Sequence, residues 1–143
     1  MIYTALTKKA LKLCFEAHKE QTDKTGLPYV FHPFHLAEQM DDELSTVCAL
    51  LHDVVEDTEY GFEDLRKMGY PEEVIEVLSL LTHNDGTPYM DYVKNLSSNA
   101  TAKKVKLADL RHNSDLSRLD KIDEWALKRQ KKYEEAIDFL SKN

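Results

Sequence analysis

The sequence predicts an all-α protein, a compact single-domain bundle of helices. Apolar residues recur at spacings of three and four along most of the 143 residues, which is the period of an α-helix. No segment alternates apolar and polar residues as a half-buried β-strand would. The length fits one domain, and no repeat or linker divides the chain, so we expect residues 1–143 to form one unit.

The first helix is predicted from apolar residues at helical spacing: Leu6, Ala10, Leu13, Cys14 and Ala17. We expect it to end near Glu20. Residues 21–28 are rich in turn-forming residues and should be a loop. Pro33 is then expected to open a short helix just after His32, because proline suits the first turn of a helix.

A strongly apolar helix is expected from about Glu43 to Val55. Few of its positions are polar, so it should lie in the centre of the bundle. The next helix should begin at Pro71-Glu-Glu, since proline and acidic residues suit a helix start, and Asn84-Asp-Gly should end it.

The C-terminal third is predicted to contain three more helices. They are expected around Tyr89–Leu96, Ala100–Leu116 and Asp123–Leu140. The last of them carries an apolar stripe that would face the core: Ala126, Tyr133, Ala136, Ile137 and Leu140.

Composition and charge exclude several classes of protein. A hydrophobic fraction of 42% and a charged fraction of 31% are typical of a soluble globular chain. The net charge of −7 argues against broad binding to nucleic acid, which needs a dense basic face. No apolar run could span a membrane and the first residues do not resemble a signal peptide, so we expect a cytoplasmic protein. Cys14 and Cys48 lack a nearby partner cysteine and are expected to be buried free thiols.

His52 and Asp53 are the first candidates for a functional site. They are adjacent within the most hydrophobic segment, where an ionised carboxylate is costly unless a cation compensates it. Glu56 and Asp57 follow one turn later and extend the same face. A metal ion bound to this face is the favoured interpretation. The alternative is a surface strip with acidic residues at the end of a helix.

One helix cannot surround a metal ion, so further ligands must come from elsewhere. His32 precedes a proline, in a rigid position, and Asp109 lies in an apolar helical segment. His35, one turn beyond His32, is an alternative to it. His112 is read as a structural group, and Lys103, Lys104 and Lys106 as a solvated helix face from which one lysine could reach a substrate phosphate.

The order His32, His52-Asp53, Asp109 resembles the H…HD…D pattern of the HD phosphohydrolase superfamily. More narrowly, three segments are similar to the hydrolase domain of RelA/SpoT-type proteins and to small alarmone hydrolases: Gly26-Leu-Pro-Tyr-Val-Phe-His-Pro33, Ala49-Leu-Leu-His-Asp-Val-Val-Glu-Asp-Thr58 and Lys106-Leu-Ala-Asp-Leu-Arg-His-Asn113. The similarity covers about residues 5–119. It implies an all-helical HD-type fold.

The resemblance also implies a metal, a reaction and roles for residues. One divalent ion, Mn²⁺, would be held by His32, His52, Asp53 and Asp109, and this mixture of imidazole and carboxylate suits manganese. Removal of the 3′-pyrophosphate from (p)ppGpp would leave GDP or GTP. Glu56 is assigned as general base with Asp57 in support, although the two could be reversed.

Four residues match the nucleotide contacts of the family: Lys24, Thr25, Tyr29 and Asn113. Asn113 lies one turn after Asp109 and should share its face of the helix. Tyr29 could equally be a core aromatic residue, and Lys24 could be a solvated loop charge. A small-molecule nucleotide is therefore the expected partner.

Two departures from the family pattern leave the substrate open. Asp23 stands where many members have arginine, which should weaken the binding of a polyphosphate. Arg111 is displaced by one position, or about 100° around the helix. A hydrolase of another nucleotide or phosphoester and a noncatalytic nucleotide-binding module therefore remain alternatives. The chain is too short for the synthetase half of bifunctional relatives.

Overall fold

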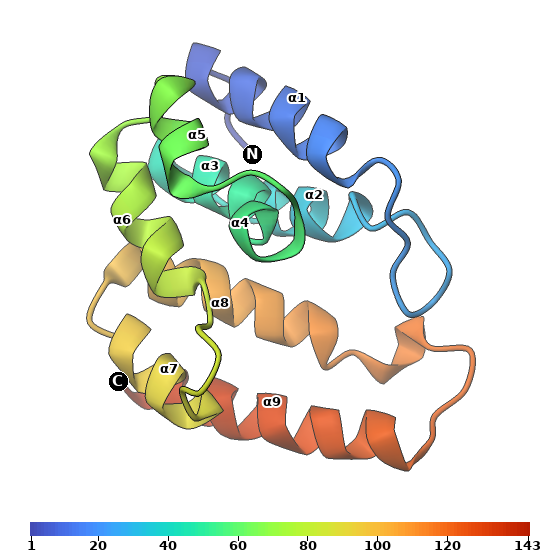
Figure 1. Ribbon diagram of the computed structural model, residues 1–143. Coiled ribbons are helices and arrows are strands. Elements are labelled where there is room, and N and C mark those ends of the chain that lie inside the picture. Colours follow the sequence, from blue (N-terminus) through green and yellow to red (C-terminus); the bar gives the residue numbers. More distant parts are fainter.

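The structure, a computed structural model, describes residues 1–143 and consists of helices and loops (Figure 1). The helices are α1 (Ala5–His18), α2 (Phe31–Glu38), α3 (Glu43–Leu51), α4 (Val54–Asp57), α5 (Phe62–Lys67), α6 (Glu72–Leu81), α7 (Tyr89–Leu96), α8 (Ala100–Asn113), the 3₁₀ helix η1 (Leu116–Arg118) and α9 (Glu124–Lys142). The predicted all-α class is confirmed.

Helix α3 lies at the centre of the bundle, as its composition predicted. It packs against α1, α2, α6 and α8, and every residue from Ser45 to Leu51 is buried. Asp42 caps the helix by accepting a hydrogen bond from the backbone N–H of Ser45 at 2.7 Å. The central helix therefore delivers the residues that follow it, His52 and Asp53, to the middle of the molecule.

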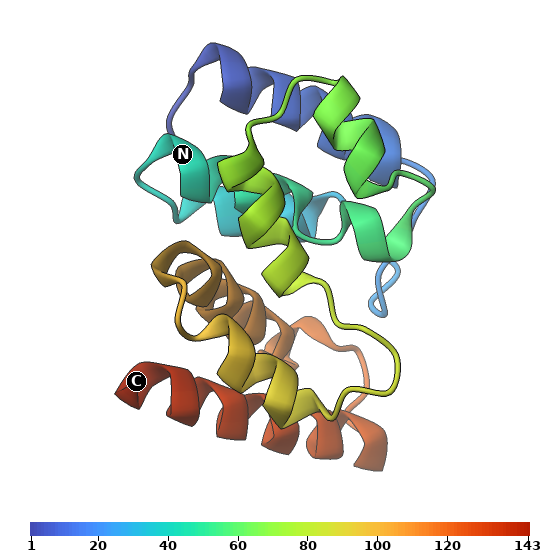
Figure 2. The same ribbon diagram turned by 60° about the vertical axis from the view of Figure 1, so that its left-hand side comes forward.

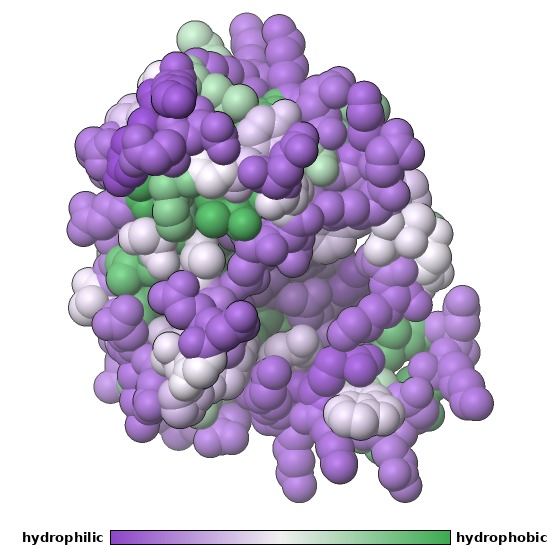
Figure 3. Space-filling view, viewed as in Figure 1, coloured by the Kyte–Doolittle hydropathy of each residue, from purple (hydrophilic) through white to green (hydrophobic).

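The helices form two groups that meet at this point. In Figures 1 and 2, α1 to α5 lie on one side, α7 to α9 lie on the other, and α6 runs between them. The contacts of α3 with α8, and of α6 with both, join the two groups. The space-filling view shows a hollow between them, lined largely by hydrophilic residues (Figure 3).

The expected helix from Glu43 to Val55 is interrupted at His52 and Asp53. Helix α3 ends at Leu51, Asp53 has φ −107° and ψ 2°, and the single turn α4 follows. The carbonyl of Ala49 would accept the N–H of Asp53 in an unbroken helix. Here this carbonyl accepts a hydrogen bond from Nδ1 of His52 at 2.7 Å. The side chain of His52 therefore takes part in ending the helix.

Smaller differences concern one additional helix and the ends of others. Helix α5 was not predicted. Asp64 stabilises its start by accepting a hydrogen bond from the N–H of Gly61 at 2.8 Å. Helix α8 ends at Asn113 rather than Leu116, because Asp115 begins a separate 3₁₀ turn. Helix α7 has the predicted bounds, and Cys14 and Cys48 are buried and free as expected. None of the helices combines the length and apolar character needed to cross a membrane.

Candidate metal centre and active site

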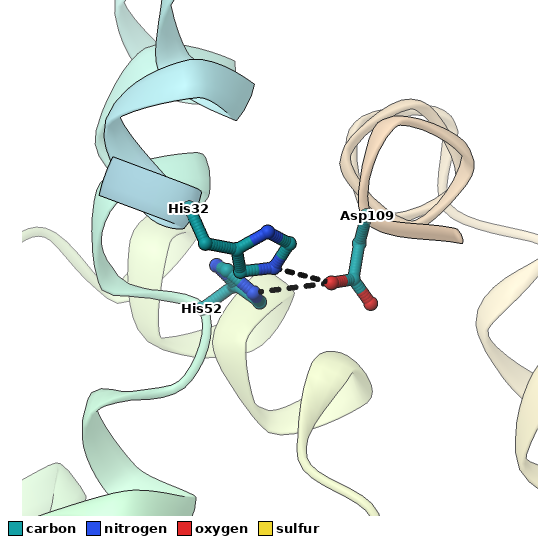
Figure 4. A group of neighbouring side chains, drawn as sticks. All are labelled: His32, His52 and Asp109. Atoms are coloured by element: carbon teal, nitrogen blue, oxygen red, sulfur yellow. Dashed lines mark hydrogen bonds and ion pairs between the residues drawn. The ribbon is translucent and has the colours of Figure 1, made fainter. Parts of the chain in front are cut away.

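Three residues from distant parts of the chain meet where the two groups of helices join. His32 comes from α2, His52 from the turn after α3, and Asp109 from α8 (Figure 4). Nε2 of His32 lies 2.8 Å from Oδ1 of Asp109, and Nε2 of His52 lies 3.5 Å from the same oxygen. The residues are only 3%, 5% and 6% exposed, so the cluster is buried.

This cluster fits a divalent metal ion. One possible ligand atom from each of the three residues lies within 4.8 Å of the others. Nδ1 of His52 is engaged with the carbonyl of Ala49, which leaves the lone pair on Nε2. That Nε2 is buried and has no hydrogen-bond partner, yet it faces two carboxylates. A cation in this position would satisfy the nitrogen and the carboxylates together.

Asp53 adds the fourth expected ligand. Its Oδ2 lies 3.2 Å from Nε2 of His52, and the same oxygen accepts a hydrogen bond from the hydroxyl of Tyr29. Asp53 also belongs to a second cluster with Glu56 and Asp57, whose carboxylate oxygens lie within 4.8 Å of one another. All six residues predicted as ligands or catalytic groups are thus gathered at one place.

The pKa values reflect the uncompensated charge of this cluster. Burial alone would lower the pKa of His52, but Asp53 and Asp109 raise it well above its usual range. Burial alone would raise the pKa of Asp109, but Lys106 and the two histidines hold it well below its usual range. The carboxylates therefore remain ionised and favour a bound cation or proton at the imidazoles.

Lys106 is largely buried, with 12% of its side chain exposed, and is not part of a solvated helix face. Its ammonium donates to Oδ2 of Asp109 at 2.9 Å and lies over the rings of Tyr89 and Tyr92. Oδ1 of Asp109 is left to face the histidines, and Asn113 donates to this oxygen at 3.0 Å. The sequence prediction for Lys106 was wrong because the aromatic residues of α7 that cover it are distant in the sequence. Lys104 is the surface lysine, and it pairs with Asp41.

Glu56 and Asp57 lie at the rim of the cluster. Oε1 of Glu56 accepts a hydrogen bond from the backbone N–H of His83 at 2.5 Å, which holds the carboxylate beside the loop after α6. Burial, followed by the charges of Asp53 and Glu56, raises the pKa of Asp57 to about 6. Burial also raises the pKa of Glu56. Both carboxylates are therefore more basic than ordinary surface acids.

Two cavities adjoin Asp53 and Asp57, which line both. The first, here called the Arg129 cavity, has a volume of about 330 Å³ and contains the cations Lys24, Arg118 and Arg129. The second, the Glu56 cavity, has a volume of about 320 Å³ and is lined by these charged and polar residues: His52, Glu56, His83, Asp85, Lys106 and Asp109. Each is large enough to hold part of a small ligand.

The four predicted substrate contacts, Lys24, Thr25, Tyr29 and Asn113, all line the Arg129 cavity. The hydroxyl of Thr25 donates to Asp23 at 2.6 Å. The hydroxyl of Tyr29 donates to Asp53, and the side-chain amide of Asn113 donates to Asp109. Lys24 forms no ion pair, and burial together with the nearby Arg129 and Lys132 lowers its pKa.

The discordant Asp23 has a structural role. Its Oδ1 accepts from the backbone N–H groups of Thr25 at 2.8 Å and Leu27 at 3.1 Å, and Oδ2 lies 3.5 Å from a guanidinium nitrogen of Arg118. Its charge is compensated within the protein, so the expected penalty on binding an anion is reduced. Arg111 is exposed and lines neither cavity, as its displaced position suggested.

Sequence reasoning missed three residues of the Arg129 cavity: Arg118, Arg129 and Tyr133. Arg129 and Tyr133 lie four residues apart and so share a face of α9, which was a detectable signal. His35, the alternative ligand, is exposed and packs on His112, while His112 stacks on the ring of His32 at 4.9 Å between centroids. The buried group that could hold a metal ion contains His32 and not His35.

An all-helical bundle in which the residues of an H…HD…D pattern meet in one buried cluster has the architecture of an HD-type hydrolase domain. No protein-family profile matches the chain. The guanosine-3′,5′-bis(diphosphate) 3′-pyrophosphohydrolase MESH1 of Danio rerio is 31% identical over 144 residues, which cover 91% of this chain and 79% of that protein. The chain therefore belongs to the family of these RelA/SpoT-type hydrolases.

Other relatives agree with this assignment. A solved structure described as a metazoan ortholog of SpoT that hydrolyzes ppGpp has a TM-score of 0.75, is 26% identical and covers 98% of this chain and 88% of its own. A GTP pyrophosphokinase of Streptomyces coelicolor is 33% identical over 153 residues, or 94% of this chain. The chain spans only 17% of the length of that relative, so the similarity concerns one region of a longer protein.

Proposed function

We propose that this chain is a metal-dependent hydrolase that removes the 3′-pyrophosphate of (p)ppGpp. The observation that carries this proposal is the position of the His and Asp cluster between two cavities, one of which contains the unpaired cations Lys24 and Arg129. The MESH1 and SpoT relatives carry names that specify this activity. We further propose that residues 1–143 act as one domain, in the cytoplasm, on this nucleotide.

The proposed ligands of the ion are His32, His52, Asp53 and Asp109. Two neutral imidazoles and two carboxylates suit a divalent cation such as Mn²⁺ and would balance its charge. The ion, when bound, would polarise the phosphoryl group and lower the pKa of a water molecule. Lys106 keeps Oδ2 of Asp109 occupied, so Oδ1 is the oxygen available to the ion.

Lys24 and Arg129 are proposed to bind the 5′-phosphates of the substrate. Neither side chain forms an ion pair within the protein, so their charge is available to an anionic ligand. The same cavity is lined by the proposed ligands His32 and Asp53, which suits a nucleotide that carries phosphate groups at both its 5′ and 3′ positions. Thr25, Tyr29 and Asn113 also line this cavity.

Glu56 is proposed as the general base, with Asp57 supporting it. Displacement at phosphorus requires the attacking water and the leaving oxygen to lie roughly in line. We place the nucleoside in the Arg129 cavity, so that O3′ leaves toward it, and the attacking water in the Glu56 cavity, which Glu56 lines. The Glu56 carboxylate accepts a proton from the water as its oxygen bonds to phosphorus and the bond between phosphorus and O3′ breaks. O3′ then takes up a proton from solvent and becomes the 3′-hydroxyl of the product.

Incubation of the protein with Mn²⁺ and ppGpp, followed by chromatography and phosphorus NMR, tests the proposal. We expect equal amounts of GDP and pyrophosphate, and no turnover after chelation of the metal. A Glu56→Gln sample prepared in parallel excludes a contaminating hydrolase. The same incubation with a panel of nucleotides and phosphoesters tests the alternatives.

Two results would overturn the proposal. Intact ppGpp together with cleavage of another phosphoester would indicate a different HD-type hydrolase. Binding of a nucleotide without release of phosphate or pyrophosphate from any compound would indicate a noncatalytic module.

A further inference from the structure

Three polar side chains form a connected chain behind the metal centre, on the side of α1. They are His18 at the end of α1, Gln21 in the following loop, and Tyr29 just before α2. Of these three residues, the sequence singled out only Tyr29, either as a contact to the nucleotide or as a core aromatic residue. His18 is 1% exposed, so its ring is enclosed by the protein.

The contacts run in one direction, toward α4. Nδ1 of His18 lies 2.8 Å from Oε1 of Gln21, which as a carbonyl oxygen accepts the hydrogen bond. This fixes the orientation of the Gln21 amide, and its Nε2 donates to the carbonyl of Asp57 at 2.9 Å. The hydroxyl of Tyr29 donates to Oδ2 of Asp53, and the N–H of Tyr29 donates to the carbonyl of Gln21 at 2.9 Å.

The four-residue helix α4 needs support from outside. A single turn is not stable by itself, because too few hydrogen bonds offset the cost of ordering it. Asp53 precedes this turn and no side chain caps it. Gln21 satisfies the carbonyl of Asp57, one of the groups that a helix end leaves free. The turn is therefore held at one end through Tyr29 and at the other through Gln21.

We propose that His18, Gln21 and Tyr29 form a brace that positions Asp53 and Asp57, and that Tyr29 is a positioning residue for the metal ligand Asp53. The inference rests on the proposed function, since it assumes that Asp53 binds a metal ion. It replaces the role of Tyr29 as an aromatic surface for the nucleotide.

The packing of the Tyr29 ring supports this change of role. One neighbour is the ring of His18, with 4.8 Å between centroids, and another is the ring of His32, at 5.7 Å. The hydroxyl is engaged with Asp53. Both the ring and the hydroxyl thus already have partners within the protein, and these partners include two of the proposed metal ligands.

Tyr29→Phe tests the inference directly, because it removes the hydroxyl and keeps the ring. We expect Mn²⁺ affinity, measured by calorimetric titration, to fall about 10- to 100-fold, as is usual when a hydrogen-bond partner of a metal ligand is lost. The melting temperature of the metal-free protein should change little, whereas its increase on addition of Mn²⁺ should shrink. Tyr3→Phe, at an exposed position, is the matched control.

Gln21→Leu tests the other end of the brace. We expect a lower kcat, a weaker affinity for Mn²⁺ and an altered EPR spectrum of the bound ion, with little change in KM, because α4 loses its support. Gln39→Leu is the control, since Gln39 also donates to a backbone carbonyl but lies on the exposed side of α2. In the double variant Gln21→Leu/Tyr29→Phe, the loss in Mn²⁺ affinity should be smaller than the sum of the losses in the two single variants, as expected for residues that act through one element.

The outcomes separate this inference from the proposed function. A wild-type protein that binds no Mn²⁺ would refute the proposed metal site itself. If the wild type binds Mn²⁺ and Tyr29→Phe binds it equally well but has a raised KM, Tyr29 is a substrate contact and the brace is refuted. Unchanged affinity and kcat in Gln21→Leu would likewise refute the role of Gln21.

Discussion

The two cavities beside Asp53 and Asp57 are similar in size, at about 330 and 320 Å³, but differ in charge. The Arg129 cavity contains three cations, two of which have no partner carboxylate. In the Glu56 cavity the buried cation Lys106 is already paired with Asp109. The difference teaches that an anionic ligand has free charges to bind on one side only. The Glu56 cavity instead contains the proposed base, Glu56, which the backbone N–H of His83 in the loop after α6 holds in place.

Asp109→Ala should have the largest effect, because it removes a proposed metal ligand from the cluster that lines the two cavities. We expect loss of bound Mn²⁺, measured by elemental analysis. A loss of about 3–5 kcal/mol in the free energy of unfolding should accompany it, since the buried Lys106 is left without its partner. Asp91→Ala, at an exposed position on α7, is the control. Retained metal would remove Asp109 from the ligand set.

Glu56→Gln should affect catalysis in the Glu56 cavity and leave binding in the Arg129 cavity unchanged. The amide oxygen can still accept from the N–H of His83, so the local structure and metal affinity should be unchanged. We expect kcat to fall about 10²- to 10⁴-fold, the usual contribution of a general base. Glu59→Gln, an exposed neighbour, controls for the loss of charge. An unchanged kcat would assign the base to Asp57.

Arg129→Ala should affect substrate binding in the Arg129 cavity. Loss of a charged contact to phosphate is worth about 1.5–3 kcal/mol, so KM should rise roughly 10- to 100-fold while kcat changes little. Arg66→Ala removes an exposed arginine that pairs with Glu63 and Glu72, and should leave KM unchanged. If Arg129→Ala lowered kcat and left KM unchanged, the proposed assignment of phosphate binding to the Arg129 cavity and of catalysis to the Glu56 cavity would be wrong.

The smallest expected effect is a pH dependence of the metal-free protein. Asp57 has a pKa near 6 in the folded state against 3.8 ordinarily, so the folded protein binds this proton more tightly. Its contribution to stability is complete below about pH 4 and is lost as pH rises through 6. Because Asp57 is exposed, we expect only about 1 kcal/mol, measured by urea unfolding at several pH values. Asp57→Asn should remove this contribution. If the free energy of unfolding changed with pH equally in Asp57→Asn and in the wild type, this prediction would be contradicted.

The sequence predicted the helical class and the motif around His52 because helical spacing and a contiguous motif are local features, which can be read without knowing what packs where. His32 and Asp109 entered the proposed ligand set through the family resemblance, and the structure brings both beside His52. Lys106 illustrates the limit, since its burial depends on Tyr89 and Tyr92, which reach it only after folding. The break at His52 was missed because a side chain competes there for the carbonyl of Ala49. Arg129 was missed because its spacing from Tyr133 shows only that the two share a face of α9, and not that this face lines a cavity.

His32 and Asp109 are separated by 77 positions in the sequence, yet their side chains lie 2.8 Å apart. Folding has already closed this long loop, so the proposed ligands are assembled before an ion arrives. An unfolded chain would have to close the loop itself, at a cost of about 4.5 kcal/mol, which weakens its hold on the ion on the order of a thousandfold. The ion should therefore discriminate strongly between folded and unfolded chains. Metal supply would then set how long each molecule survives unfolding and proteolysis, besides how fast it turns over.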